Sequence, residues 1–413
     1  MSFNVNIDIN SYVDLFNTFK LPYLDLLKKV HKSNIIRIKN KNKIKIAFQI
    51  ACLAEWIGDE LVSLFIKNPK FDVMVVITWQ TNTNREEEMT LLHNHFKESG
   101  LPYCFADGSI HPGDFDIILY TSPYAFVMEN WHESEIPLST LVCYIPYGFY
   151  VANIQGMQYN LFLHNICWKK FLLQKEDYIL QDKYCGIGSY GTVFSGYPKM
   201  DKLLDPECKK TAKWKCTNNN VKKIIFAPHH SINETPFVST FDTNYMFFLE
   251  YASEHTNTTS WVFKPHPLLG LSCVKNGVFS SLEEWDLYCQ TWDTLPNAKF
   301  VEGEYMPWFA SSDAMILDSM SFISEYLYVD KPALFLTREN EGFNEYGIQV
   351  LKAYYHSKGD DYNSIMKFIE FDIKNDNKHT IRKEIFNNLL DYNRINGVSA
   401  TEFIYNNIVD VFQ

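Results

Sequence analysis

Long apolar runs and paired cysteines are both missing from this sequence of 413 residues. No apolar run approaches the roughly 18 residues that a membrane-spanning helix needs, and the start lacks the charged, apolar and small-residue succession of a signal peptide. The nine cysteines lie singly, without CxxC spacing, and their number is odd. A zinc cage or a disulfide framework is therefore not expected. We predict a cytoplasmic protein whose cysteines are reduced core residues.

Positive charge is also scarce, since the formal net charge is −11. Neutralising the phosphates of DNA or RNA needs a basic surface, so we expect no nucleic-acid partner. The exception is the segment 28–45, which carries eight basic residues and no acidic one and follows an amphipathic segment at 12–27. This combination is typical of a surface that contacts an anionic membrane, and it is equally compatible with a solvated helix followed by a loop.

Compact apolar runs alternate with helix-like segments through the rest of the chain. With 46% hydrophobic residues, the chain can build two domains with sizeable cores. The runs that predict strands lie at 45–51, 71–79, 115–120, 141–145, 223–227, 260–263, 314–317 and 333–336. The alternation predicts an α/β protein with two Rossmann-like, doubly wound sheets and helices at the C-terminal end.

We expect three parts along the chain. A basic amphipathic segment spans 1–43, an N-terminal Rossmann-like acceptor domain spans 44–195, and a C-terminal Rossmann-like nucleotide-donor domain with a helical tail spans 196–413. Open α/β sheets bind ligands at the carboxyl ends of their strands, so the two domains are expected to face a cleft that holds the site.

Polar residues follow three predicted strands of the second half. Residues 228–231 follow the first, residues 264–267 follow the second, and residues 318–321 follow the third and open a helix that continues through Glu325. Either His229 or His230 is suited to accept a proton, because an unperturbed histidine has a pKa of about 6.5. The alternative is that these are ordinary hydrogen-bonded structural residues.

The same strand ends offer groups for an anionic substrate. Lys264 and His266 are suited to neutralise a pyrophosphate as the leaving group departs. The helix start at 319–322 offers free backbone N–H groups for a phosphate, with Ser321 adding a hydroxyl. Simple N-capping by Asp318 or Ser319 is the structural alternative.

Several motifs of the second half carry a resemblance. GYPKMD at 196–201, FAPHH at 226–230, FKPHP at 263–267 and the stretch 304–336 together resemble the CDP-glycerol glycerophosphotransferase family of teichoic-acid and capsule polymer synthesis. The resemblance covers 196–336. It implies a GT-B-type fold, a CDP-activated glycerol or ribitol donor, metal-independent transfer of the phospho-alditol with release of CMP, and peripheral association with the membrane.

Three motifs depart from the family's pattern. Pro228 is followed by two histidines where the family usually shows Thr-Trp-Arg, and Lys264 replaces the arginine of Arg-x-His-Pro, which keeps the charge but loses the bidentate fork. In the final motif, usually Asp-Tyr-Ser-Ser followed by Asp, Met320 replaces the first serine and Glu325 replaces the second acid. The sequence predicts catalytic roles for His229, His230 and His266 without a metal. It predicts donor or phosphate binding by Pro198, Lys199, Lys264, Asp318, Ser319, Ser321 and Glu325.

Two other patterns receive structural interpretations. The segment 186–191 fits GxGxxG, but no long amphipathic helix follows it, so we interpret it as a joint between domains. The segment 114–116 fits the DxD pattern of metal-dependent glycosyltransferases, yet it precedes its strand, whereas a metal pair is expected where a strand delivers it to the site.

Polar and aromatic residues also follow predicted strands of the first half. In a GT-B arrangement this half holds the acceptor, and the expected acceptor residues are Glu55, Trp56, Tyr124 and Tyr147. Each also has an ordinary interpretation as a core aromatic or turn residue.

The sequence thus predicts a transferase without cofactors that moves a glycerol phosphate or related alditol phosphate from a CDP-activated donor to a hydroxyl of a glycan or lipid-linked polymer. It is expected in the cytoplasm, with possible peripheral contact with the inner face of an anionic cell membrane. Two alternatives stay open: a GT-B glycosyltransferase that uses a nucleotide sugar, and a non-catalytic module that binds a glycan or a partner.

Overall fold

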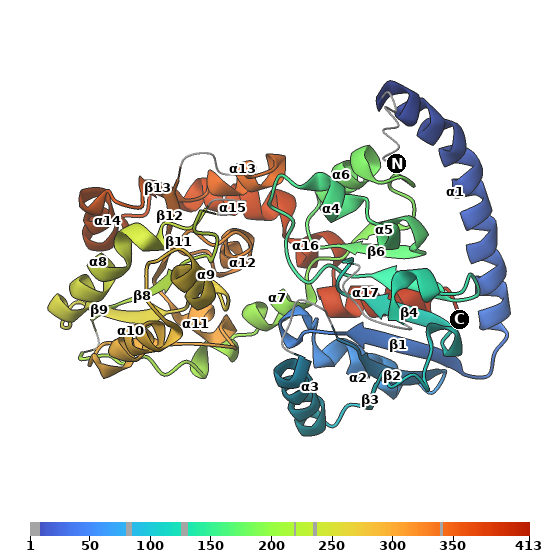
Figure 1. Ribbon diagram of the computed structural model, residues 1–413, viewed down its shortest axis with the longest axis horizontal. Helices are drawn as coiled ribbons and strands as arrows, with labels where there is room; N and C mark the ends of the chain where they lie inside the picture. The colour runs from blue at the N-terminus through green and yellow to red at the C-terminus, as the bar shows by residue number, and fades with distance from the viewer. Residues whose placement is uncertain (1–8, 80–84, 125–130, 219, 234–237, 339–341) are drawn as a thin grey trace, which may run out of the picture. The chain divides into compact units, whose positions relative to one another are not determined.

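A computed structural model describes residues 9–79, 85–124, 131–218, 220–233, 238–338 and 342–413, with the side chains of the first helix described from residue 20. The chain forms two compact units (Figure 1). Unit 1 comprises Met1–Gly148, Gln155–Pro198 and Tyr392–Gln413, and unit 2 comprises Phe149–Ile154 and Lys199–Asp391.

Unit 1 contains a seven-stranded parallel sheet in the order β3-β2-β1-β4-β5-β6-β7. Its strands are β1 (Ile44–Ile50), β2 (Phe71–Ile77), β3 (Tyr103–Phe105), β4 (Ile117–Tyr120), β5 (Leu141–Tyr144), β6 (Lys169–Leu172) and β7 (Thr192–Phe194). Its helices are α1 (Ile9–Lys39), α2 (Asp59–Lys67), α3 (Arg85–Ser99), α4 (Gln155–Tyr159), α5 (Phe162–Ile166), α6 (Asp177–Tyr184), α16 (Tyr392–Asn396) and α17 (Ala400–Val409). The central strands are apolar on both faces because helices cover both sides of a parallel sheet.

Unit 2 contains a six-stranded parallel sheet in the order β10-β9-β8-β11-β12-β13. Its strands are β8 (Lys222–Ala227), β9 (Thr259–Phe263), β10 (Ala298–Phe300), β11 (Ala314–Leu317), β12 (Ala333–Thr337) and β13 (Tyr355–Lys358). The helices in this part of the chain are α7 (Pro198–Leu204), α8 (Phe241–Glu254), α9 (Leu269–Lys275), α10 (Leu282–Thr294), α11 (Met306–Ser311), α12 (Phe322–Glu325), α13 (Glu345–Leu351), α14 (Tyr362–Lys367) and α15 (His379–Leu389). The predicted α/β class with two doubly wound sheets is confirmed.

The N-terminal basic segment lies in helix α1 as far as Lys39 and then in a loop before β1, which agrees with the interpretation of a helix followed by a loop. Leu27 and Ile38 are buried on its inner face. Arg37 and Lys41 pair with the buried carboxylate of Asp116, at 3.1 and 2.7 Å. Part of the basic charge therefore fixes the end of the helix to the rest of unit 1, at whose margin α1 lies in Figure 1. No helix within the described ranges is long and apolar enough to cross a membrane.

The GxGxxG and DxD segments both have structural roles. The glycine-rich turn supports α1, because His31 stacks on Tyr190 and accepts or donates a 3.0 Å hydrogen bond to its hydroxyl. In the DxD segment, Asp114 accepts the backbone N–H of His111 at 2.8 Å, and Asp116 is committed to its two cations. Both acids therefore have partners within the protein.

The last two helices, α16 and α17, lie in a different unit from the one expected, because the domain prediction placed all of 196–413 together. Residues 392–413 belong to unit 1, where the red C-terminal helices of Figure 1 lie beside its strands. The ring of Tyr405 packs on Phe65 with centroids 5.0 Å apart, and its hydroxyl accepts a 3.0 Å hydrogen bond from the side-chain amide of Asn68. Periodicity in the sequence identifies such a helix but not the sheet that it covers.

Candidate functional site

The three polar segments predicted for the second half lie at one edge of the unit 2 sheet. Strands β9, β8 and β11 are neighbours in this sheet and run parallel, so their carboxyl ends meet at the same edge. The strand order also reverses between β8 and β11, which is the place where open α/β sheets bind ligands. The segments 228–231 and 318–321 flank this switch point.

Three histidines form a cluster at this edge. The ring centroids of His229 and His230 are 4.3 Å apart, those of His230 and His266 are 4.2 Å apart, and those of His229 and His266 are 5.2 Å apart. One ring nitrogen from each lies within 4.8 Å of the others, a spacing that would also suit a metal ion. The structure therefore brings the three predicted catalytic histidines together.

Backbone contacts decide which ring nitrogens carry protons. The N–H of Ser231 donates to Nδ1 of His229 at 3.2 Å, and the N–H of Leu268 donates to Nδ1 of His266 at 3.1 Å. A backbone N–H only donates, so both Nδ1 atoms are unprotonated and each neutral ring carries its proton on Nε2. A metal ligand normally has the opposite arrangement, with the second nitrogen donating its proton. The cluster is thus better suited to an oxyanion than to a metal.

Burial keeps these rings neutral. It lowers the pKa of His229 well below its usual value and that of His266 to about 3, with the neighbouring His230 acting in the same direction. A neutral ring with its proton on Nε2 acts as a hydrogen-bond donor. This geometry favours His229 as a donor over its predicted role as a base and leaves His230 as the other predicted base.

Lys264 supplies a buried positive charge at the end of β9. Lys264 is 6% exposed. Within the described part of the chain, its Nζ donates one hydrogen bond, to the backbone carbonyl of Pro265 at 3.4 Å. Among those same residues, no carboxylate lies within 4.0 Å of Nζ. Burial lowers the pKa of this ammonium, whereas Glu302 and Glu325 raise it. A buried ammonium without a close counterion is costly, which indicates a site for an anion.

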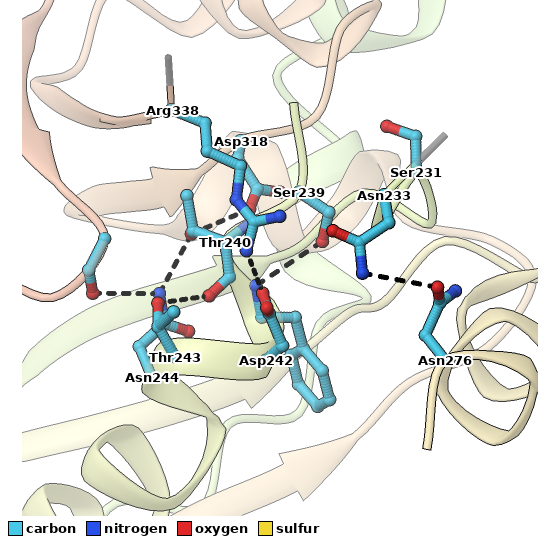
Figure 2. A network of polar contacts seen from close by, with 12 residues as sticks. Ser231, Asn233, Ser239, Thr240, Asp242, Thr243, Asn244, Asn276, Asp318 and Arg338 are labelled. Carbon is cyan, nitrogen blue, oxygen red and sulfur yellow. Dashed lines mark hydrogen bonds and ion pairs between the residues drawn. The ribbon is translucent and has the colours of Figure 1, made fainter. Parts of the chain in front are cut away.

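Asp318 holds the histidine loop in place. Its Oδ1 accepts the backbone N–H of His229 at 2.5 Å. Its Oδ2 accepts the N–H and the hydroxyl of Thr240 at 2.5 and 2.9 Å, and Figure 2 shows these two residues together. Burial raises the pKa of this carboxyl to about 7, although these donors and Arg338 lower it. Since both oxygens are committed to the protein, Asp318 positions the loop, and its predicted direct contact with the donor does not fit.

The predicted helix start at 319–322 is also different in the structure. Helix α12 begins at Phe322, ends at Glu325 and continues only as a 3-10 turn. Such a short helix does not provide the dipole that the phosphate prediction required. Ser321 precedes α12 without a side-chain capping bond, and Ser319 is buried.

Glu325 lies near two lysines of the predicted donor site. The hydroxyl of Tyr305 donates to its Oε2 at 2.7 Å. Burial raises the pKa of Glu325 to about 7, while Tyr305, Lys199 and Lys264 lower it. Lys199 follows Pro198 at the start of α7. The charges of Lys199 and Lys264 therefore both act on the carboxyl of Glu325, although Lys264 is not paired with it.

Sequence analysis missed Arg338, which follows β12 at the same carboxyl edge. Its guanidinium pairs with Asp242 in the first turn of α8, and Figure 2 shows it beside Asp318. A basic residue directly after a predicted strand was the available signal.

The predicted acceptor residues of unit 1 divide into two groups. Trp56 is 5% exposed, packs on Phe96 at 4.9 Å and donates its indole N–H to Asp59 at 2.8 Å, so it is a core residue and not an acceptor contact. Tyr124 and Tyr147 lie together, with ring centroids 6.5 Å apart, and both feel the charge of Glu55.

Comparison with known proteins gives the fold its name. No family model and no curated protein matches the sequence. Among solved structures, the wall teichoic acid polymerase TagF matches with a TM-score of 0.57 at 10% identity, covering 98% of this chain and 98% of that chain. The fold is of the GT-B type.

Two further solved structures share this GT-B architecture. UDP-GlcNAc 2-epimerase from Neisseria meningitidis, bound to UDP-GlcNAc, has a TM-score of 0.55 at 14% identity, covering 89% of this chain and 100% of that chain. The S. aureus MnaA–UDP co-structure has a TM-score of 0.51 at 15% identity, covering 88% of this chain and 96% of that chain.

Proposed function

We propose that this chain is a GT-B transferase that moves glycerol phosphate, or a related alditol phosphate, from a CDP-activated donor to a hydroxyl of a cell-surface polymer and releases CMP. The observation that carries the proposal is the buried ammonium of Lys264, which lacks a close carboxylate in the described ranges and lies at the same strand ends as the histidine cluster. The likeness to TagF, which has also been solved after a CDPG soak, supports this donor class.

The side chains divide the work of an in-line transfer. The acceptor oxygen attacks the β-phosphorus of the donor, the bond from that phosphorus to the CMP oxygen breaks, and His230 takes the acceptor's proton. The Nε2–H groups of His229 and His266 donate to phosphoryl oxygens, and Lys264 neutralises the charge that grows on the leaving CMP. Positioning and electrostatics carry the rate, and no metal or cofactor is required.

Incubation with CDP-glycerol and a glycerol-phosphate acceptor, followed by phosphorus NMR, tests this reaction. Wild-type protein should produce CMP and a new phosphodiester. His266→Gln should slow the reaction by about ten- to a thousandfold, because removing one donor to a developing oxyanion has effects up to that size. Absence of both products with wild-type protein, across glycerol and ribitol donors, would contradict the proposal.

A nucleotide-sugar reaction is the second candidate. It is favoured by the likeness to structures solved with UDP-GlcNAc and with UDP. In that reaction the bond that breaks joins the sugar carbon to the β-phosphate oxygen, so UDP leaves in place of CMP. Chromatography of the released nucleotide, with both donors offered at equal concentration, separates the two candidates.

We also propose that unit 1 contacts the cytoplasmic face of an anionic membrane through the outer face of α1. Leu21, Leu26 and Ile36 are 69%, 59% and 56% exposed on this helix. Lys28 and Lys29 are exposed alongside them. Each lysine near an anionic surface contributes about 1 kcal/mol, and the apolar side chains insert at the headgroup level.

Vesicle co-sedimentation tests the membrane contact. Binding to phosphatidylglycerol vesicles should exceed binding to phosphatidylcholine vesicles and should fall about tenfold or more in a Lys28→Gln/Lys29→Gln variant. Lys209→Gln/Lys210→Gln, at two exposed positions of unit 2, is the control. Equal binding to both lipids would argue against the contact.

A further inference from the structure

The carboxyl edge of the unit 1 sheet has a switch point of its own. The strand order β3-β2-β1-β4-β5 reverses direction between β1 and β4, and all these strands are parallel. Ligands of open α/β sheets bind between the loops that follow two such strands. Here these loops begin at residues 51 and 121, and the loop after β5 begins at residue 145 beside them.

We propose that this edge binds an uncharged, hydroxyl-rich ligand, a polyol or a sugar, through the phenols of Tyr124 and Tyr147 and the carboxylate of Glu55. The inference rests on the proposed function, for which such a ligand is the acceptor end of the polymer. It assigns these three residues to binding and leaves the chemistry to unit 2.

The two phenols form a positioned pair. Their hydroxyls hydrogen-bond to each other, and their ring centroids are 6.5 Å apart. The hydroxyl of Tyr197 donates to the backbone carbonyl of Tyr147 and so holds the turn that carries it. Burial, followed by the neighbouring phenol and Glu55, raises the pKa of Tyr147, and burial likewise raises that of Tyr124. Both phenols therefore stay protonated and can donate and accept hydrogen bonds.

Glu55 lies on a loop whose backbone is held by a hydrogen bond to Glu88. It ends the short 3-10 helix Leu53–Glu55, whose first backbone N–H donates to the carboxylate of Glu88 at 2.6 Å. Burial, Glu88 and Glu55 together raise the pKa of Cys52 to about 12, so this thiol is not a nucleophile at neutral pH. The loop thus presents a carboxylate acceptor without a reactive group beside it.

Unsatisfied polar atoms at the same strand ends are an independent indication of a ligand. Thr121 and Ser122, directly after β4, are 2% and 4% exposed, and Gln49, near the end of β1, is 1% exposed. Oγ1 of Thr121, Oγ of Ser122 and Oε1 of Gln49 have no hydrogen-bond partner in the described ranges. Each such group costs about 1–3 kcal/mol, and ordered water or a bound ligand is the usual explanation.

The charges of these loops favour a neutral ligand. The segments 51–58, 121–124 and 145–148 contain neither lysine nor arginine. In unit 2, the corresponding edge carries Lys264 and Arg338. A phosphate needs cationic or N–H-rich surroundings, whereas phenols and a carboxylate match the hydroxyls of a polyol or a sugar.

Saturation-transfer NMR with glycerol, ribitol and N-acetylglucosamine tests the inference on the full chain. At least one of these probes should bind wild-type protein, and Tyr147→Phe and Glu55→Gln should each weaken that binding by about tenfold, as expected for a lost hydrogen bond to a charged or paired group. The matched control is Tyr103→Phe on β3, which removes a hydroxyl that is hydrogen-bonded to His93 at 2.9 Å. This variant should bind the probes as wild type does. Circular dichroism checks that each variant is folded, and Tyr124→Phe replaces any variant that is not.

Two outcomes would overturn the inference: no binding of any probe to wild-type protein, or equal binding by wild type and both folded edge variants. A parallel titration with CMP separates this failure from failure of the proposed function. If CMP binds but no probe does, the result contradicts the inferred acceptor site and leaves the proposed donor site standing. Probe binding that depends on Tyr147 and Glu55, without CMP binding, supports the site and contradicts the proposed donor.

Discussion

Replacing Asp318 by asparagine tests whether one buried carboxyl positions the histidine loop. Its two oxygens accept the backbone N–H groups of His229 and Thr240, each at 2.5 Å. An amide has one carbonyl oxygen and an NH2 group, so one of these two N–H groups must face another donor. Leaving it unsatisfied costs about 1–3 kcal/mol, and we expect the loop to shift and nucleotide affinity to fall about tenfold.

The same substitution should also change how the free energy of unfolding depends on pH, and the size of this change follows from the pKa of Asp318. The folded protein holds the Asp318 proton up to about pH 7, whereas the unfolded chain releases it near its ordinary pKa of 3.8. Between these values the folded state binds more protons, so the contribution of Asp318 to the free energy of unfolding falls as pH rises. The fall is about 1.4 kcal/mol per pH unit, or about 4 kcal/mol across the window.

Urea unfolding of wild type and Asp318→Asn, from pH 4 to pH 8, measures this difference. Relative to wild type, the variant should gain about 4 kcal/mol of stability between pH 4 and pH 7, because asparagine does not titrate. Asp313→Asn is the control, since that carboxylate accepts the Lys223 N–H at 2.9 Å where β8 and β11 begin. A constant difference between wild type and Asp318→Asn, together with unchanged nucleotide affinity, would refute the reasoning.

Two further substitutions test the packing of each unit by urea unfolding. Gly196 has a φ of +79°, and an added Cβ would lie 2.1 Å from Cδ1 of Tyr392. We expect Gly196→Ala to lose about 2–5 kcal/mol from backbone strain and overpacking together. Arg382 is 1% exposed and pairs with Asp330 at 3.0 Å and Asp376 at 2.5 Å. Arg382→Met should lose about 3 kcal/mol, at the lower end for a broken buried pair because both acids are partly exposed.

Each of these two predictions has a matched control. Gly100 has a similar φ of +68° with nothing within 4 Å of an added Cβ, so Gly100→Ala should show strain alone, about 1–2 kcal/mol. Lys383 is exposed and lies 3.8 Å from Asp330, so Lys383→Met should lose at most about 1 kcal/mol. Equal losses within either pair would contradict the structural explanation.

The strands and the meeting of the strand-end motifs were predictable from the sequence. Helices cover both faces of a parallel sheet, so its strands need apolar side chains on both faces. A continuous apolar run such as 223–227 therefore predicts a strand of such a sheet. His229 and His266 follow neighbouring parallel strands, whose carboxyl ends share one edge. Short-range pattern and sheet geometry together were therefore enough to predict this clustering.

The roles of individual polar atoms were not predictable in the same way. Asp318 meets the N–H of His229, which is 89 residues away, and no local pattern encodes that contact. The ring tautomer of His266 depends on the N–H of Leu268, whose direction follows from the backbone turn. Trp56 is of a residue type that often stacks on glycans, but its contacts with Phe96 and Asp59 place it in the core.

Calorimetric titration of CDP-glycerol, CMP and UDP tests the central claim, that the unit 2 edge binds the anionic part of a nucleotide donor. Wild type should bind CDP-glycerol, and Lys264→Met should weaken this binding by about ten- to a hundredfold, as expected for a charged hydrogen bond worth about 1.5–3 kcal/mol. Lys222→Met, which removes an ammonium bonded to two backbone carbonyls at 2.6 and 3.0 Å at the opposite end of the sheet, should bind as wild type does. Equal affinity of wild type and Lys264→Met, or no binding of any of these nucleotides to wild type, would contradict the claim.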